Sequence, residues 1–159
     1  LLALNKIKKE NKTDISLLLK VSPDIEDNHI SEIVDVATNN DIAAIILTNT
    51  TNVNRDNLKS EFKEKKGGLS GEPLQQISTN MIKKFYRQLN GKIPIIGVGG
   101  VNSGESAYEK IIAGASLLQL YTSFVYKGPS IAKEIKKELI QILKAEGINN
   151  IKDAVGKGV

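Results

Sequence analysis

Short apolar runs alternate along this chain with longer segments in which apolar residues recur every three or four positions. The short runs are typical of β-strands, and the longer segments are typical of helices with one buried face. The run Ile42–Leu47 is apolar throughout, which indicates a parallel strand that is buried on both faces. The predicted strands are residues 15–22, 42–50, 93–97 and 116–121.

Polar and turn residues mark the ends of the predicted helices. Asp27 and Ser103 are expected N-caps, because a short side chain that carries an oxygen can accept a hydrogen bond from a free backbone N–H. Pro129 is expected in the first turn of the last helix, and Gly147 just after the end of that helix. The predicted helices are residues 1–11, 27–38, 77–89, 103–113 and 129–146.

This order of elements predicts a right-handed parallel α/β fold. Gly97–Gly100 follows the third predicted strand and Tyr121–Thr122 ends the fourth, so both turns are expected at one edge of the sheet. In a (β/α)8 TIM barrel the turns after the last two strands commonly bind phosphate, and a whole barrel has about 250 residues. We therefore expect this chain of 159 residues to be the C-terminal half of a barrel, with about the last four βα units in one domain over residues 1–159.

Composition narrows the classes of partner. Only 4% of the residues are aromatic, and the net charge of +4 comes from acidic and basic residues that are mixed along the chain. Such a chain has few surfaces on which bases can stack, so we expect no nucleic-acid partner. It has no cysteine for thiolate catalysis, and its sequence shows no spacing typical of metal ligands. No apolar run reaches the ~20 residues that a membrane-spanning helix needs.

Two predicted strand ends carry polar groups that are candidates for ligand binding. Lys20 lies near the end of the first strand, where its ammonium group either points into the mouth of the barrel or extends to solvent. Thr48, Asn49 and Thr50 follow the second strand, at the edge that carries the active site in barrels. Their amide and hydroxyl groups can hold a small polar ring, or they can bond only to local backbone. Both alternatives stay open on the residues alone.

Glycines mark the other candidate segments. Residues 51–76 form a connection longer than the about 2–6 residues usual in α/β units, and long connections are often functional. Gly67, Gly68 and Gly71 within it permit the backbone to approach a flat ligand closely, or they only make the segment flexible. In the turn after the third strand, Gly100 lacks a Cβ, so that backbone N–H groups can approach an anion. These features predict a site for phosphate or a nucleotide cofactor.

The single histidine, His29, is expected in an exposed first turn of a helix without a partner, and therefore without a catalytic role.

Five segments, taken in order along the chain, resemble the dihydroorotate dehydrogenase family. The similarity extends over essentially the whole chain. Two segments, Gly67–Leu74 and Tyr126–Pro129, resemble the quinone-using, membrane-associated class 2 of this family rather than its soluble class. The five segments are Lys20–Asp24, Thr48–Thr51, Gly67–Leu74, Pro94–Gly100 and Ala113–Thr122.

The resemblance implies an FMN-containing flavoprotein, an oxidoreductase of pyrimidine biosynthesis. Such an enzyme oxidises dihydroorotate to orotate and passes the electrons from FMN to a quinone. Lys20 would bond to the flavin ring, where its charge stabilises the reduced, anionic flavin. The residues implied to contact FMN are Lys20, Thr48, Gly71, Gly100, Tyr121 and Thr122, the last two at its phosphate. Those implied to bind the pyrimidine substrate are Asn49 and Thr50.

The resemblance also implies that part of the enzyme lies outside this chain. The catalytic base of this class is a serine in the first half of the barrel, so Ser70 and Ser103 are not expected to replace it. The missing N-terminal half would also supply further substrate contacts and the quinone tunnel, and the chain alone is expected to be inactive. The implied location is peripheral to the membrane, on the cytoplasmic side of the bacterial inner membrane.

Two alternatives from other classes stay open. One is a non-catalytic phosphate-binding half-barrel that dimerises to cover its open sheet, and the other is a different phosphate-binding barrel enzyme, such as an isomerase. Lys20 together with Asn49 and Thr50 favours a flavin and a planar pyrimidine over either. In every case we expect the chain by itself to associate, because an open parallel sheet exposes an apolar face.

Overall fold

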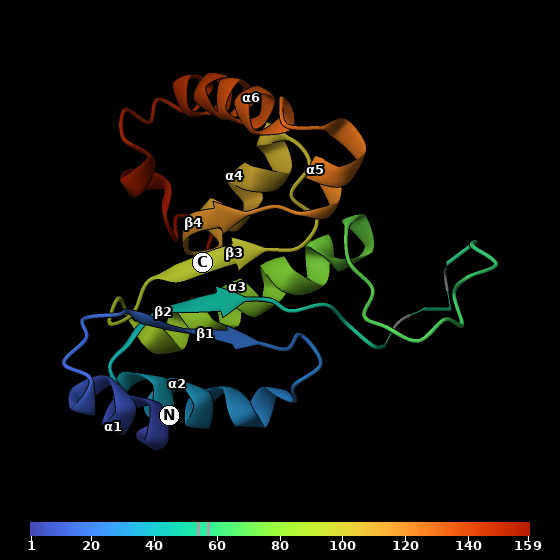
Figure 1. The fold of residues 1–159 in the computed structure, drawn as a ribbon. Coiled ribbons are helices and arrows are strands. Elements are labelled where there is room, and N and C mark those ends of the chain that lie inside the picture. The colour runs from blue at the N-terminus through green and yellow to red at the C-terminus, as the bar shows by residue number, and fades with distance from the viewer. Residues whose placement is uncertain (54, 57) are drawn as a thin grey trace.

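A single parallel sheet of four strands, in the order β1-β2-β3-β4, organises the chain (Figure 1). The computed structural model describes residues 1–53, 55–56 and 58–159. The observed strands are shorter than the predicted ones: β2 and β4 end earlier, because the polar residues that follow them belong to turns, and β1 and β3 begin two residues later. Their bounds are β1 (Leu17–Val21), β2 (Ile42–Leu47), β3 (Ile95–Val98) and β4 (Ala115–Gln119).

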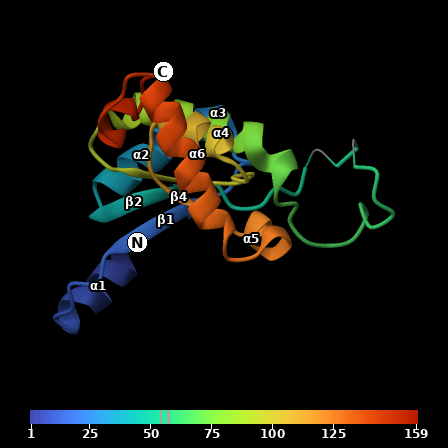
Figure 2. The same ribbon diagram turned by 90° about the horizontal axis from the view of Figure 1, so that it is seen from above.

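Helices α2, α3 and α4 lie along the same face of this sheet, and α6 packs on α4 (Figure 2). Each strand is followed by at least one helix, which confirms the predicted βα alternation. The helices are α1 (Leu2–Glu10), α2 (Ile30–Thr38), α3 (Gln75–Leu89), α4 (Gly104–Ile112), α5 (Thr122–Lys127) and α6 (Ile131–Ala145), with short 3-10 turns at Asp27–His29, Glu72–Leu74 and Ile151–Ala154.

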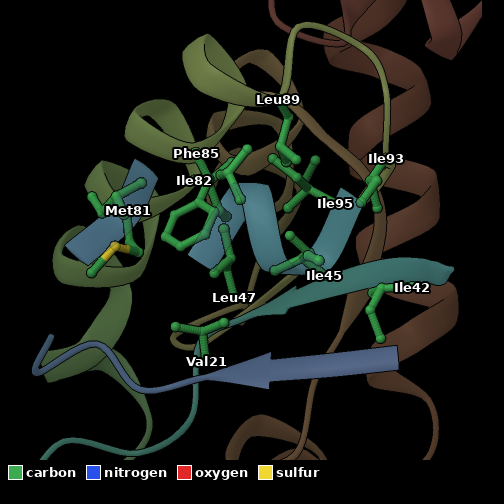
Figure 3. Packing of buried hydrophobic residues seen from close by; sticks show 14 of the residues in the cluster. Val21, Ile42, Ile45, Leu47, Met81, Ile82, Phe85, Leu89, Ile93 and Ile95 are labelled. Atoms are coloured by element: carbon green, nitrogen blue, oxygen red, sulfur yellow. The ribbon is translucent and has the colours of Figure 1, made fainter. Parts of the chain in front are cut away.

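The main core lies between α3 and the middle of the sheet. Phe85 and Ile82 of α3 pack in one cluster with Ile45 and Leu47 of β2 and Ile95 of β3 (Figure 3). All five side chains are at most 1% exposed. Burying a side chain of this size stabilises the fold by roughly 1.5–3 kcal/mol, so this cluster fixes how the strand ends are placed.

The opposite face of the sheet is exposed in part: Ala44 and Ile96 in its middle are buried, whereas side chains of the outer strands β1 and β4 are open. Successive side chains of a strand point to opposite faces, and the strand register places Lys20, Ile46, Ile96 and Leu117 in one row across that face. Leu117 is 63% exposed, and Leu18 on the same face of β1 is 48% exposed. We refer to this surface, formed by Leu18, Lys20, Ala44, Ile46, Ile96, Val98, Leu117 and Gln119, as the inner face.

Several helix ends differ from the prediction. Asp27 is not the N-cap of α2: it lies in a 3-10 turn, and its two carboxylate oxygens accept hydrogen bonds from Lys84 Nζ at 2.6 and 2.8 Å. Ser103 is the N-cap of α4, as predicted, and its Oγ accepts from the N–H of Ser106 at 3.2 Å. Pro129 lies outside the last helix, because α6 begins at Ile131.

Other short features also depart from the prediction. Helix α5 was not predicted from the sequence, because this six-residue helix has no buried side chain and so leaves no helical spacing of apolar residues. His29 is exposed as expected, but its Nδ1 lies 3.7 Å from Glu32 Oε2, so it does have a partner. Among the described residues, no helix is both long enough and apolar enough to cross a bilayer.

The long connection after β2 is closed at its base. Thr51 and Leu69 form an isolated antiparallel bridge, with N···O distances of 3.1 and 2.7 Å. Asp24, in the loop after β1, accepts from the Thr51 hydroxyl at 2.5 Å and from the N–H of Asn52 at 2.8 Å. The bridge therefore separates the outer part of the connection from residues 70–76, which lead back to the sheet.

Candidate functional site

The carboxyl ends of all four strands line one cavity. Its volume is about 250 Å³. The connection after β2 and the start of α5 complete its wall. All eight residues that the family resemblance implies to contact the cofactor or the substrate line this cavity. The lining residues are Lys20, Thr48, Asn49, Thr50, Ser70, Gly71, Leu74, Val98, Gly99, Gly100, Val101, Leu120, Tyr121 and Thr122.

Lys20 brings a positive charge to this cavity. It lies on the inner face of β1, in register with Ile46 of β2. The neighbouring Val21 points to the opposite face and is buried in the main core, so strand alternation fixes the direction of the lysine. Of the two alternatives that the sequence left open, the structure favours the lysine that points into the barrel mouth.

Thr48, Asn49 and Thr50 leave β2 and cross the cavity wall. Backbone bonds hold them to both neighbouring strands: the Thr48 N–H donates to the Val98 carbonyl at 3.1 Å, and the Asn49 N–H donates to the Val21 carbonyl at 2.8 Å. The Leu47–Thr48 peptide bond is cis.

Some polar groups of this segment form hydrogen bonds within the segment itself. Asn49 Oδ1 accepts from the Thr50 N–H, and the Thr48 hydroxyl donates to the Asn49 carbonyl, both at 2.9 Å. Both bonds join a side chain to the neighbouring backbone, which is one of the two alternatives that the sequence left open. Asn49 is exposed nevertheless and lines the cavity, so its amide group can still face a ligand.

The turn after β3 presents backbone donors to the cavity. Gly99 and Gly100 have φ angles of 114° and 74°, which favour glycine. Among the described residues, the structure gives their two N–H groups no acceptor. A Cβ on Gly100 would lie 2.6 Å from the Cα of Gln75, so the turn is packed directly against the start of α3. Such a pair of open N–H groups suits an anion.

The glycine cluster in the long connection divides into two parts. Gly71, with a φ of 81°, lines the cavity, and a Cβ there would lie 3.0 Å from Thr122 Cγ2. Gly67 and Gly68 do not line this cavity, and Gly68 packs against the side chain of Thr50 instead. Of the three glycines, only Gly71 therefore stays a candidate for a ligand contact in this cavity.

A second cavity of about 330 Å³ adjoins the first. Ser70, Gly71, Gly100, Val101 and Thr122 line both. The second cavity also reaches Lys127 of α5, whose Nζ donates to the Asn102 carbonyl at 3.0 Å. Lys20 lines the first cavity and Lys127 the second, so each of the two has a cationic side chain in its wall. We refer to the two adjoining cavities together as the hollow.

Three buried polar residues behind the site were missed. Lys110 of α4 is 0% exposed, and its Nζ donates to the Gln75 carbonyl at 3.2 Å, Ser78 Oγ at 3.2 Å and Thr79 Oγ1 at 3.1 Å. Burial lowers the pKa of Lys110 to about 8, and the charge of Glu109 opposes that shift in part. A signal was present, because Lys110, Ser78 and Thr79 occupy positions on helix faces that are otherwise apolar.

The residues around the hollow fit a flat ligand that carries an anionic tail. Leu74, Val98 and Leu120 supply apolar contacts, while hydroxyl and backbone groups supply hydrogen bonds. The open N–H groups of Gly99 and Gly100 supply a place for a phosphate. Flavin mononucleotide has this combination of a planar ring system and a phosphate. The fold and the site together define a parallel α/β protein with a cavity at the carboxyl edge of its sheet, where backbone N–H groups suit an anion.

Comparison with known proteins identifies the family. The family model described as dihydroorotate dehydrogenase matches residues 2–143 of this chain. The chain belongs to the dihydroorotate dehydrogenase family.

Curated relatives agree with this assignment. The chain is 44% identical to the dihydroorotate dehydrogenase (quinone) of Nostoc punctiforme, over 96% of this chain and 43% of that protein. It is 46% identical to the enzyme of the same name from Nautilia profundicola, over 92% and 40%. It is 44% identical to the mitochondrial enzyme of Mus musculus, over 89% and 36%. The chain therefore spans about two fifths of the length of these relatives.

Solved structures confirm the fold. A ligand-free dihydroorotate dehydrogenase of Eimeria tenella matches with a TM-score of 0.85 at 42% identity, over 89% of this chain and 39% of that one. The same enzyme in complex with ferulenol matches equally well, over 38% of its length. The four parallel strands of this chain and their helices correspond to about four βα units of that barrel, as the sequence predicted.

Proposed function

We propose that this chain is the FMN-binding C-terminal half of a quinone-dependent dihydroorotate dehydrogenase. The whole enzyme would oxidise dihydroorotate to orotate in pyrimidine biosynthesis. The observation that carries this proposal is the convergence of Lys20, Asn49, Gly100 and Thr122 on one cavity in a chain of this family. Residues 1–159 would form part of a single barrel domain.

The cofactor would lie along the two adjoining cavities. Lys20 and Thr48 would contact its ring system, and Gly71 would contribute a backbone contact. Gly100, Tyr121 and Thr122 would surround its phosphate at the end of the hollow nearer α5. When bound, FMN supplies the chemistry that accepts a hydride. The ammonium of Lys20 favours negative charge on the ring, because opposite charges interact strongly where water is excluded.

Asn49 and Thr50 would hold the pyrimidine ring of the substrate from the end of β2. A pyrimidine dione offers N–H donors and carbonyl acceptors side by side, and an asparagine amide can pair with both kinds of group. Asn49 and Thr50 would thus hold the substrate, while Lys20 and Thr48 would hold the cofactor ring in the same cavity.

The proton-abstracting group would come from the first half of the barrel. Ser70 lines the cavity, but its hydroxyl lies 2.9 Å from the Thr122 hydroxyl on the cofactor side and has no neighbouring base among its hydrogen-bond partners in the described chain. Ser103 caps α4. Neither serine would therefore replace the missing base, and the chain alone would be inactive.

The electrons would pass to a quinone, and the whole enzyme would associate with the membrane periphery. The names of the relatives from Nostoc punctiforme and Nautilia profundicola support the quinone as acceptor.

Spectroscopy of the protein with its complete barrel tests the proposal. The purified protein is expected to be yellow, to lose its flavin absorbance when dihydroorotate is added without oxygen, and to regain it when a quinone is added. A colourless protein that instead binds sugar phosphates would overturn the proposal in favour of another barrel enzyme.

Two variants separate the roles of the residues. Lys20→Met is expected to slow the loss of flavin absorbance at saturating dihydroorotate, by about tenfold to a hundredfold, because it removes a charge from the ring. Asn49→Ala is expected mainly to raise the concentration of dihydroorotate at which the rate of flavin reduction reaches half its maximum. Lys133→Met is the matched control, since Lys133 is exposed on α6 away from both cavities.

A further inference from the structure

A buried lysine lies directly behind the glycine turn of the site. Lys110 does not line either cavity, yet its three N–H donors are all used on oxygens of α3, from Gln75, Ser78 and Thr79. Within the described chain no carboxylate lies within 4 Å of this ammonium group. All its hydrogen-bond acceptors are therefore neutral.

Stability alone does not account for a charge in this place. Burying an ammonium group costs free energy even when it is hydrogen-bonded, and replacing such a group by an apolar side chain of similar size is often neutral or stabilising. The position at the start of α3 adds to the cost, because a helix N-terminus carries partial positive charge. A methionine would fill the same volume without either cost, so the charge calls for a functional reason.

The hydrogen bonds continue from Lys110 to the site. Ser78 accepts from Lys110, and its own hydroxyl donates to the Val98 carbonyl at 2.5 Å. The other lone pair of that carbonyl accepts from the Thr48 N–H at 3.1 Å. Ser78 is 0% exposed, so no water competes for these bonds. The carbonyl of Val98 is thus fixed from two sides.

Fixing this carbonyl also fixes the donor of the next residue. The Val98–Gly99 peptide bond is trans, and in a trans peptide the C=O and the N–H point in opposite directions. The carbonyl is held by α3 and β2, so the Gly99 N–H is directed away from them. It has no acceptor among the described residues and belongs to a glycine that lines the cavity. Hydrogen bonds in a chain polarise one another, so the ammonium at its start strengthens the donor at its end.

We propose that Lys110 is a positioning residue that holds, through Ser78, the Gly99–Gly100 turn in the orientation that binds the phosphate of the flavin. This inference rests on the proposed function and extends it to a residue that never touches the ligand. Lys110 acts in two ways: it fixes the peptide plane of Val98 and Gly99, and it places a positive charge behind the N–H groups that face the anion.

The test compares FMN with riboflavin, which has the same ring system but no phosphate. Both affinities are measured by quenching of flavin fluorescence on the protein with its complete barrel, freed of cofactor. Lys110→Met is expected to weaken FMN binding about tenfold, the value of one good hydrogen bond, and to leave riboflavin binding nearly unchanged. Ser78→Ala is expected to have the same effect, because it interrupts the same chain of bonds.

Thr79→Val is the matched control. Thr79 also accepts from Lys110 and is buried, but it has no bond to the Val98 carbonyl. This variant is expected to keep the wild-type ratio of FMN to riboflavin affinity, whatever it does to the melting temperature. The double variant of Lys110→Met and Ser78→Ala is expected to lose no more than either single variant, because both act through one chain.

The outcomes separate this inference from the proposed function. If Lys110→Met and Ser78→Ala both keep the wild-type affinity ratio, the inference is overturned, even if the variants are less stable. If Lys110→Met does not fold, the ratio of FMN to riboflavin affinity of Ser78→Ala alone decides: a wild-type ratio overturns the inference. A wild-type protein that binds neither flavin would overturn the proposed function and this inference with it. A wild type that prefers FMN, with variants that lose the preference, supports both.

Discussion

The hydroxyl groups of Ser70 and Thr122 lie 2.9 Å apart, although 52 positions separate them in the sequence. This contact joins the end of the long connection after β2 to the start of α5. It closes the wall that the two adjoining cavities share, since both residues line both cavities. This part of the wall is therefore joined by two side chains and not by the hydrogen bonds of the sheet.

Removing this contact tests its role. Ser70→Ala is expected to weaken FMN binding by about threefold to tenfold, because one hydrogen bond that closes the wall is lost. The backbone N–H groups of residues 69–72 are expected to exchange faster with solvent in the same variant. Flavin fluorescence and hydrogen exchange measure the two effects. Ser130→Ala, at an exposed serine before α6, serves as the control, and an equal effect there would contradict the role.

Gly100 has a positive φ and also lies close to the backbone of Gln75. The cost of replacing it by alanine therefore has two parts, which can be measured separately. Gly100→Ala is expected to destabilise the protein and to prevent FMN binding, because the new Cβ would overlap the backbone of Gln75. Gly91 has a nearly identical φ of 75° but nothing within 4 Å of its Cβ position. Gly91→Ala therefore measures the cost of φ alone, and Gly100→Ala is expected to cost about 1–3 kcal/mol more in the free energy of unfolding. Equal losses in denaturant unfolding would show that the contact is unimportant.

The buried charge of Lys110 predicts a dependence of stability on pH. The folded protein holds this proton less tightly than the unfolded chain, since burial lowers the pKa to about 8 from the usual 10.5. The unfolded state therefore binds more protons between these values, and the free energy of unfolding rises with pH in that window. The neighbouring Glu109 opposes the shift, and the other groups around the ammonium are neutral.

Comparison with Lys110→Met isolates this contribution. Below about pH 8 the variant is expected to gain on the order of 3 kcal/mol from the absence of the titrating charge, less the hydrogen bonds that it loses. As the pH rises to about 10, the free energy of unfolding of the wild type is expected to increase relative to that of the variant. Urea unfolding at several pH values measures it. A difference that stays constant with pH would mean that Lys110 keeps an ordinary pKa.

The inner face predicts how the chain behaves by itself. Leu18 and Leu117 are about half exposed or more on that face, so the isolated chain is expected to associate. Changing both leucines to lysine is expected to raise the fraction of monomer in light scattering. Ile140→Lys, at a residue that is 52% exposed on α6, is expected to have little effect. A compact monomer of the unaltered chain would contradict this prediction.

Much of the fold and the site could be predicted because apolar runs followed by polar residues or glycines mark where the strands end. The uninterrupted apolar run of β2 identified a buried parallel strand, and the polar residues after it identified the edge where the cavity lies. Gly100 was recognised because its turn lies between a buried strand and a capped helix, where backbone N–H groups can approach an anion. Lys20 was ambiguous, and only the alternation of side chains along β1 resolved its direction.

The part that could not be predicted depends on contacts between helices. Lys110 was overlooked because a lysine on a helix is usually exposed; its position on an apolar face was a signal, but its hydrogen-bond partners on α3 are known only from the packing of the helices. The N-cap role of Asp27 failed for a similar reason, since Lys84, far away in sequence, binds its carboxylate. A single-sequence pattern contains no information about such partners.

The antiparallel bridge between Thr51 and Leu69 makes the outer part of the long connection a separable module. Because Thr51 and Leu69 join the two ends of this connection at one point, an insertion in its outer part is expected to leave the strand ends in place, except next to Gly68, which packs against Thr50. A peptide tag or a fluorescent reporter could be inserted there while the ligand hollow keeps its shape. The length and sequence of this outer part are accordingly expected to vary among homologues more than the residues that line the two cavities.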